Sequence, residues 1–68
     1  MKPGDRVRFD HMGAVHMGTV IDVVGHVVAQ TMHKSVSIKS EGFALPVIIN
    51  LTLFSNRVAL LGEEDGDR

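Results

Sequence analysis

Apolar and polar residues alternate strictly over residues 6–10 (RVRFD), close to the start of the chain. A period of two predicts a β-strand with one buried face, which here carries Val7 and Phe9, while the charged residues point outward. Residues 3–4 (PG) before this stretch and residues 11–13 after it carry turn signals. The pattern therefore predicts a short, half-buried strand between two turns.

A longer apolar stretch begins at Ala14 or Val15 and runs to Val24. Gly18 within it predicts a bulge or a sharp bend, because glycine inside a strand often marks such irregularities. Gly25 is expected to break the strand, which then resumes over residues 27–29. The second strand is therefore expected to be long, bent and interrupted.

Two further strands are predicted after this stretch. Residues 36–40 (VSIKS) alternate cleanly, which indicates a strand with one face in water. After a turn at residues 41–42, an apolar segment begins at position 44 or 46 and continues to Phe54. A helix over residues 43–54 is the alternative, but β-branched residues and Pro46 favour a strand.

A short turn at residues 55–56 and a last strand over residues 57–61 follow. Residues 62–68 (GEEDGDR) are strongly acidic, and we expect them to form a solvated, mobile tail. Short strands separated by turn signals at this spacing predict an all-β domain of five strands over residues 1–61. Its architecture is expected to be a small barrel or a tight sandwich.

The segment over residues 46–54 is apolar on both faces, although a strand of a small antiparallel barrel should have one wet face. If Ile48 and Phe54 point outward, they expose an apolar strip that Asn50 and Thr52 interrupt. The inward face then carries Val47, Ile49, Leu51 and Leu53. The strip predicts an interface of a homo-oligomer formed by Ile48, Asn50, Thr52 and Phe54. The alternative is that the acidic tail or the loop over residues 29–35 covers it.

The length and composition of the chain add a second reason to expect an oligomer. A domain of 68 residues buries only about 60% of its unfolded surface, so its core is marginal. The chain has no cysteine and therefore no disulfide or thiolate metal site to stabilise it. Self-association is the remaining common source of stability.

Charge and hydropathy exclude several classes of protein. The net charge of −1 gives no general attraction to nucleic acid. No apolar run approaches the roughly 18 residues of a membrane span. The first residues, MKPGDR, lack the apolar core of a signal peptide. We therefore expect a soluble, cytoplasmic protein without a membrane partner.

Residues 4–8 (GDRVR), 13–21 (GAVHMGTVI) and 45–49 (LPVII) resemble small SH3-like barrels grouped as electron-transport accessory proteins. The first two segments are locally most similar to the plasmid-encoded, trimethoprim-insensitive dihydrofolate reductases, which belong to this group. The resemblance covers about half of the chain. It implies a five-stranded SH3-like barrel, and it implies a tetramer whose central pore holds folate and NADPH.

The residues that serve those reductases are replaced in this chain. Their pore segment, Val-Gln-Ile-Tyr, corresponds to residues 51–54 (LTLF), which lack both the amide and the phenol. A lysine after the first strand corresponds to Phe9, and an interface tryptophan corresponds to His16. The resemblance therefore implies a shared scaffold with His16 at an interface, and an oligomeric NADPH-dependent reductase is an alternative function.

Histidine and methionine are adjacent at three places, His11-Met12, His16-Met17 and Met32-His33. Imidazole and thioether groups are suitable ligands for a soft ion such as Cu(I). Neighbouring residues of a strand point to opposite faces, however, so one pair does not chelate one ion. We expect the methionines to fill the core and the histidines to lie at the surface, with no metal site.

His26 lies among valines in the stretch VVGHVVA. Two readings are open for it. It is a buried, hydrogen-bonded side chain, or it lies at an interface where protonation near pH 6 disturbs assembly.

Four cations, Arg6, Arg8, Lys34 and Lys39, are candidates for a basic face. Small barrels bind nucleic acid by stacking bases on surface aromatic residues, and this chain has no tyrosine or tryptophan. A solvated charged face is therefore the favoured interpretation, and a nucleic-acid-binding barrel is a second alternative function.

The sequence has no nucleophile motif, no glycine-rich phosphate loop and no paired carboxylates before its acidic end. We therefore expect a non-catalytic module for protein interaction or assembly that needs no cofactor. It binds a second copy of itself or serves as an accessory subunit of a larger protein.

Overall fold

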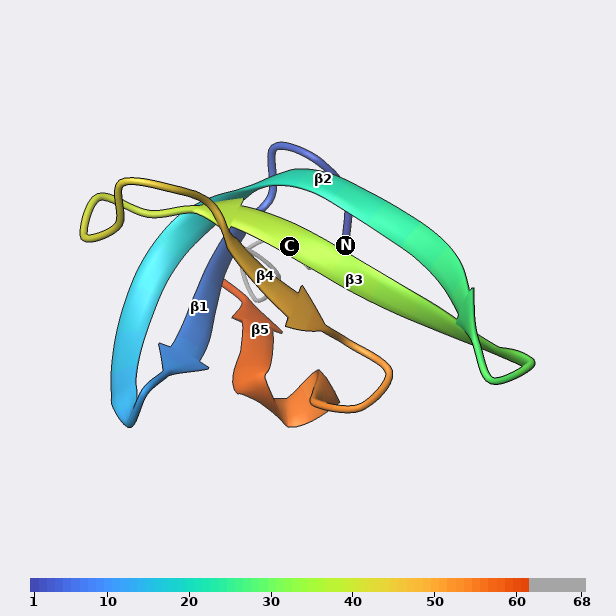
Figure 1. Cartoon of the computed structure of the whole chain (residues 1–68). Helices are drawn as coiled ribbons and strands as arrows, with labels where there is room; N and C mark the ends of the chain where they lie inside the picture. The colour runs from blue at the N-terminus through green and yellow to red at the C-terminus, as the bar shows by residue number, and fades with distance from the viewer. Residues whose placement is uncertain (62–68) are drawn as a thin grey trace.

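The computed structural model describes residues 1–61, which form one sheet of five antiparallel strands (Figure 1). The strands are β1 (Arg6–His11), β2 (Ala14–Val28), β3 (Thr31–Lys39), β4 (Val47–Asn50) and β5 (Val58–Leu60). A single turn of 3-10 helix, η1 (Ser55–Arg57), precedes β5. The predicted all-β, five-stranded fold is confirmed, and the predicted acidic tail lies outside the described residues.

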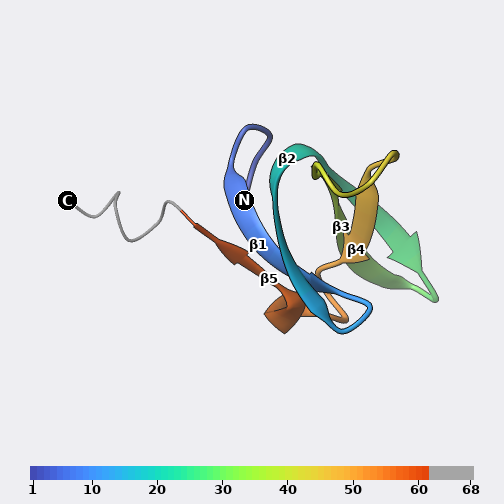
Figure 2. The same cartoon turned by 90° about the vertical axis from the view of Figure 1, so that its left-hand side faces the viewer.

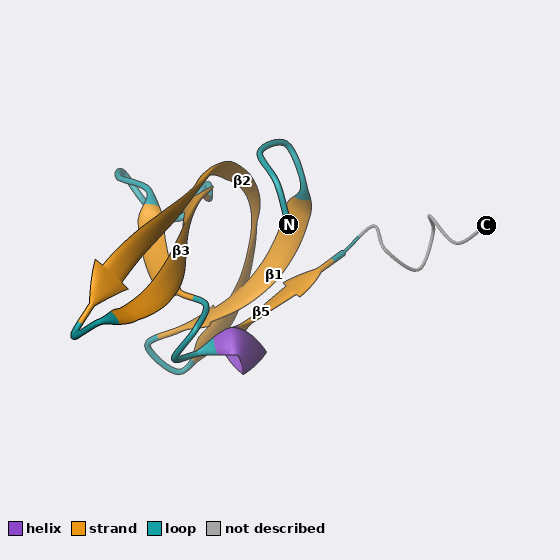
Figure 3. Ribbon diagram, turned by 90° about the vertical axis from the view of Figure 1, so that its right-hand side faces the viewer, coloured by secondary structure: helices purple, strands orange, loops and turns teal. Residues whose placement is uncertain are grey.

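The sheet has the order β4-β3-β2-β1-β5, and the long strand β2 joins its two halves. Residues 14–19 of β2 pair with β1, and residues 19–28 pair with β3. The register between β2 and β3 shifts at Ile21, where one extra residue forms a bulge. Figures 2 and 3 show β2 arching between β1 with β5 on one side and β3 on the other.

The hydrophobic core lies inside this curved sheet and takes side chains from every strand. Val7 and Phe9 of β1 are fully buried, as the alternation predicted. The other buried apolar residues are Val20, Val36, Ile38, Val47, Ile49 and Val58. The buried core therefore consists of aliphatic residues and one aromatic residue, Phe9. Burial of each such side chain contributes about 1.5–3 kcal/mol to the stability of the fold.

The sequence predicted a bulge or a sharp bend at Gly18, and the bulge of β2 lies instead at Ile21. Gly18 serves another purpose. A Cβ atom there would lie 2.5 Å from the carbonyl oxygen of Lys39 and 2.7 Å from Cγ2 of Ile38. Gly18 is therefore required because β2 and the end of β3 approach each other closely at this point.

Gly25 does not interrupt β2, contrary to the sequence prediction. The strand is continuous over residues 14–28, and Gly25 pairs with Lys34 of β3 in regular register. The pairing with β3 therefore outweighs the weak strand propensity of glycine.

The predicted strand over residues 46–54 is wrong beyond Asn50. The side-chain Oδ1 of Asn50 accepts hydrogen bonds from the backbone N–H of Thr52 at 2.9 Å and of Leu53 at 3.0 Å. An asparagine that bonds the backbone two and three residues ahead forms a turn and ends the strand. Leu53, predicted to point inward, is consequently 62% exposed.

Both long hairpins are closed by two-residue turns with positive φ angles. Met12 and Gly13, at 54° and 83°, connect β1 to β2. Ala29 and Gln30, at 51° and 68°, connect β2 to β3. Positive φ at both positions is the type I′ geometry that matches the twist of β-hairpins, and it favours asparagine and glycine over alanine and glutamine.

Candidate functional site

Large apolar side chains are exposed over much of the surface. Among residues 1–61, thirteen of them are 41 to 90% exposed. They are Met1, Met12, Val15, Met17, Ile21, Val24, Val27, Val28, Met32, Leu45, Ile48, Leu53 and Phe54. These exposed apolar residues outnumber the eight apolar residues that are buried in the described part of the chain.

Several of these residues lie on the part of β2 and β3 that extends beyond the rest of the sheet (Figure 1). We call residues 22–34 the distal hairpin. β1 leaves β2 at Thr19, and β4 pairs with β3 only from Ser35 onward. Val24, Val27, Val28 and Met32 of the distal hairpin are 48, 66, 45 and 65% exposed. The distal hairpin is therefore an apolar extension with little cover from its own chain.

The residues predicted to form an interface around β4 have two different roles. Ile48 is 69% exposed on β4, and Phe54 is 44% exposed beyond it, with the Arg57 guanidinium 5.5 Å from its ring centre. Asn50 and Thr52 instead make hydrogen bonds within the chain. Because β4 ends at Asn50, these four residues do not form one continuous strip.

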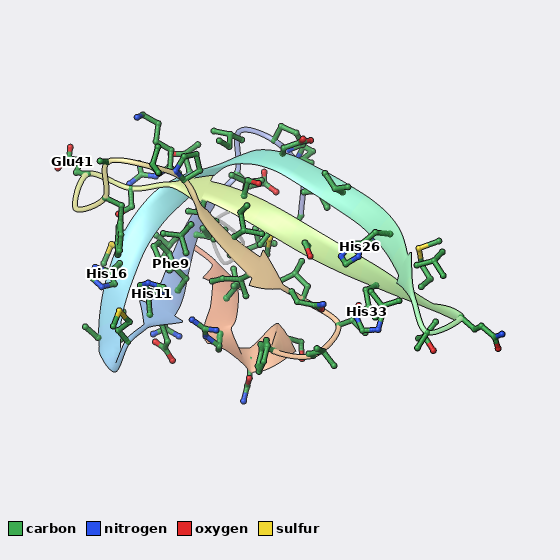
Figure 4. The ribbon with its side chains drawn as sticks, viewed as in Figure 1. Phe9, His11, His16, His26, His33 and Glu41 are labelled. Atoms are coloured by element: carbon green, nitrogen blue, oxygen red, sulfur yellow. The ribbon has the colours of Figure 1, made fainter. Side chains whose placement is uncertain are left out.

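A polar cluster joins β2, β3 and β4 on the outer face of the sheet. Nδ2 of Asn50 donates to Nδ1 of His33 at 3.0 Å, and His33 is 91% buried. A hydrogen bond of 2.9 Å joins Nε2 of His26 and Oγ of Ser35, and the His26 and His33 ring centres are 5.9 Å apart. His26 is thus half-buried and hydrogen-bonded on the distal hairpin (Figure 4).

The outer edge of β3 in the distal hairpin is covered by the turn after β4. The backbone N–H of Lys34 donates to Oγ1 of Thr52 at 3.0 Å, and the N–H of Leu51 donates to the carbonyl oxygen of Lys34 at 2.7 Å. The backbone groups of Lys34 are therefore used within the chain, and the β2 side of the distal hairpin has the longer open edge.

A cluster of four rings lies at the other end of the sheet (Figure 4). Phe43, in the loop after β3, packs against His11 and His16 at ring-centre distances of 5.2 and 4.9 Å and against Phe9 at 6.1 Å. Nδ1 of His11 is buried and has no hydrogen-bond partner in the described part of the chain. His16, predicted at an interface from the resemblance, is half-buried in this cluster.

The four candidate basic residues do not share one face. Arg6 lies opposite Thr19 of β2, which in turn lies opposite Lys39 of β3, and Arg8 is two residues further along β1. These three cations therefore lie on the outer face. Lys34 is five residues from Lys39 on the same strand and points to the opposite face.

The first residues of the chain are fixed to β2 through Asp5. The N–H of Gly4 donates to the carbonyl oxygen of Val20, and the N–H of Val20 donates to the carbonyl oxygen of Asp5, both at 2.8 Å. The backbone N–H of Lys2 donates to the Asp5 carboxylate at 2.9 Å, and this bond lowers the pKa of Asp5. This segment occupies the edge of β2 as far as Val20.

Within residues 1–61, no three His, Asp or Glu side chains are grouped in a way that could hold a metal ion. No helix in this part of the chain has the length and apolar character needed to cross a membrane. Comparisons with protein-family models, with curated proteins and with solved structures found no match.

Proposed function

We propose that this protein is a small assembly module of the SH3-like type, which associates with a second copy of itself through exposed apolar surface. The observation that carries the proposal is the exposure of the thirteen large apolar side chains described above. The sheet order β5-β1-β2-β3-β4, with β2 shared between two halves, supports the SH3-like assignment.

The small core explains why association would be favoured. Eight apolar residues are buried in the described part of the chain, and exposed apolar residues outnumber them. Each 100 Å² of apolar surface removed from water contributes roughly 2.5 kcal/mol. Contact between two copies would therefore add apolar burial that a single copy lacks, and the distal hairpin offers the least covered surface for it.

Molar mass in solution, measured by size-exclusion chromatography with light scattering, tests the proposal. We expect a mass at least twice the chain mass of 7.4 kDa. The full chain should be measured at about pH 7.5 over a range of protein concentrations. A mass of 7.4 kDa at every protein concentration would contradict self-association, and it would favour an accessory subunit that a different protein covers.

A further inference from the structure

One edge of β2 has no strand partner beyond Val20 within the described residues. We call residues 22–28 (DVVGHVV), on the side away from β3, the free edge of β2. It is longer than the outer edges of β4, which has four residues and follows Pro46, and of β5, which has three. A long, apolar, unpaired edge is a template on which another chain can add a strand.

The register of the distal hairpin shows which backbone groups point toward the free edge. Val28 and Thr31 flank the two-residue turn and form the closing pair of the ladder. The closing pair of such a turn exchanges two hydrogen bonds, and bonded pairs then alternate along the strands. Val23, Gly25 and Val27 therefore direct their N–H and C=O groups away from β3.

Two observed contacts agree with this assignment. The N–H of Val23 donates to Oδ1 of Asp22 at 2.9 Å. Lys34, which lies opposite Gly25, likewise turns its backbone away from the ladder and bonds with Leu51.

We infer that two copies of this protein pair antiparallel along the free edge, with the two-fold axis at Gly25. The inference rests on the proposed function and names the surface and the partner for it. The edge sequence places a valine two residues before Gly25, at position 23, and another two residues after it, at position 27. In this register Gly25 faces Gly25 of the second copy and Val23 faces Val27, so each outward N–H meets a C=O.

The side chains of the free edge suit this pairing. Asp22, its only charged residue, would face Val28 of the second copy and would release its own bond to Val23. Val24 would face His26, and the exposed surface of Val27 would be covered. No like charges meet, and Gly25 leaves the backbones free to approach at the axis.

Val27→Pro tests the inference, with Val27→Thr as the matched control. Proline removes an N–H that points to the free edge and leaves the bonds of β2 with β3 intact. Threonine keeps both the N–H and the β-branched shape. We expect Val27→Pro to have the mass of a single chain, 7.4 kDa, and Val27→Thr to keep the mass of the assembly.

The results separate the inference from the proposed function. If the unmodified protein associates and Val27→Pro associates equally well, the edge pairing is overturned while self-association stands. If the unmodified protein is monomeric, both are overturned. Circular dichroism establishes whether each variant is folded.

Amide hydrogen exchange of the unmodified protein makes the test independent of folding of the variant. In the assembly, the amides of Val23, Gly25 and Val27 should exchange at least about tenfold more slowly than after dilution to the monomer. Exchange of these three amides at the unprotected rate in the assembly would overturn the inference.

Discussion

Asn50 and His33 form a hydrogen bond of 3.0 Å that links the end of β4 to the buried imidazole of β3. Because Oδ1 of Asn50 accepts the N–H groups of Thr52 and Leu53, its Nδ2 must face His33. Nδ1 of His33 is therefore the acceptor, and the ring carries its proton on Nε2. One side chain thus ends a strand and fixes the tautomer of a neighbour.

Replacement of Asn50 should destabilise the fold. Asn50→Ala removes the three side-chain hydrogen bonds and leaves Nδ1 of His33 buried without a donor, so we expect a loss of about 1–3 kcal/mol. Urea unfolding followed by circular dichroism measures it. Asn56→Ala, in the exposed η1, is the control and should change the stability by less than about 0.5 kcal/mol. Equal effects of the two substitutions would contradict the role of Asn50.

The two glycines Gly18 and Gly42 should respond differently to alanine. A Cβ at Gly18 meets Lys39 and Ile38 at less than 3 Å, whereas a Cβ at Gly42 meets nothing within 4 Å. Gly18→Ala should therefore cost about 1–3 kcal/mol through overpacking, while Gly42→Ala should be close to neutral. Thermal unfolding of both variants checks the expectation, and a neutral Gly18→Ala would refute the close approach of β2 and β3.

The turn of the distal hairpin can be improved. Ala29 and Gln30 hold positive φ angles that cost a non-glycine residue roughly 1–2 kcal/mol each. The double substitution Ala29→Asn, Gln30→Gly provides the residues that a type I′ turn favours, so we expect a gain of about 1 kcal/mol. Gly13→Ala in the other hairpin, where φ is 83°, should have the opposite effect. Unfolding midpoints that move the other way would contradict the turn assignment.

Acid should remove the contribution of Asp5 to stability. Its pKa is lowered below the ordinary value of 3.8, chiefly by the backbone N–H of Lys2. A group whose pKa is lower in the folded state stabilises the fold at pH values above its unfolded pKa. That stabilisation is lost as the pH falls through the folded pKa. Asp5→Asn should therefore be less stable than the unmodified protein near pH 7 and equally stable at about pH 2. A difference in unfolding free energy that persists in acid would contradict this account.

Local patterns were sufficient to predict the parts of the fold that follow a simple alternation. Val7 and Phe9 are buried because a period of two places them on the same face of β1. The extent of β4 was not predictable in this way, because Asn50 ends the strand through its side chain and not through hydropathy. The roles of Gly18 and Gly25 were not predictable for the same reason, since both depend on β3. Gly18 lies against Lys39 and Ile38, which are distant in the sequence, and Gly25 pairs with Lys34.

The candidate surface was predicted only in part from the sequence. Ile48 and Phe54 are exposed as expected, but the distal hairpin was read as an interrupted strand and a loop. The distal hairpin is exposed because β1 and β4 end before they reach it. Where these strands end along their neighbours is defined by the register of the sheet and not by the local pattern of residues. The burial of His33 likewise requires Asn50, which is 17 residues away.

Sedimentation velocity of the full chain over about a hundredfold range of concentration determines whether the protein associates with itself. We expect a species of at least twice 7.4 kDa that dissociates on dilution or persists throughout. A single species of 7.4 kDa at every concentration would contradict it.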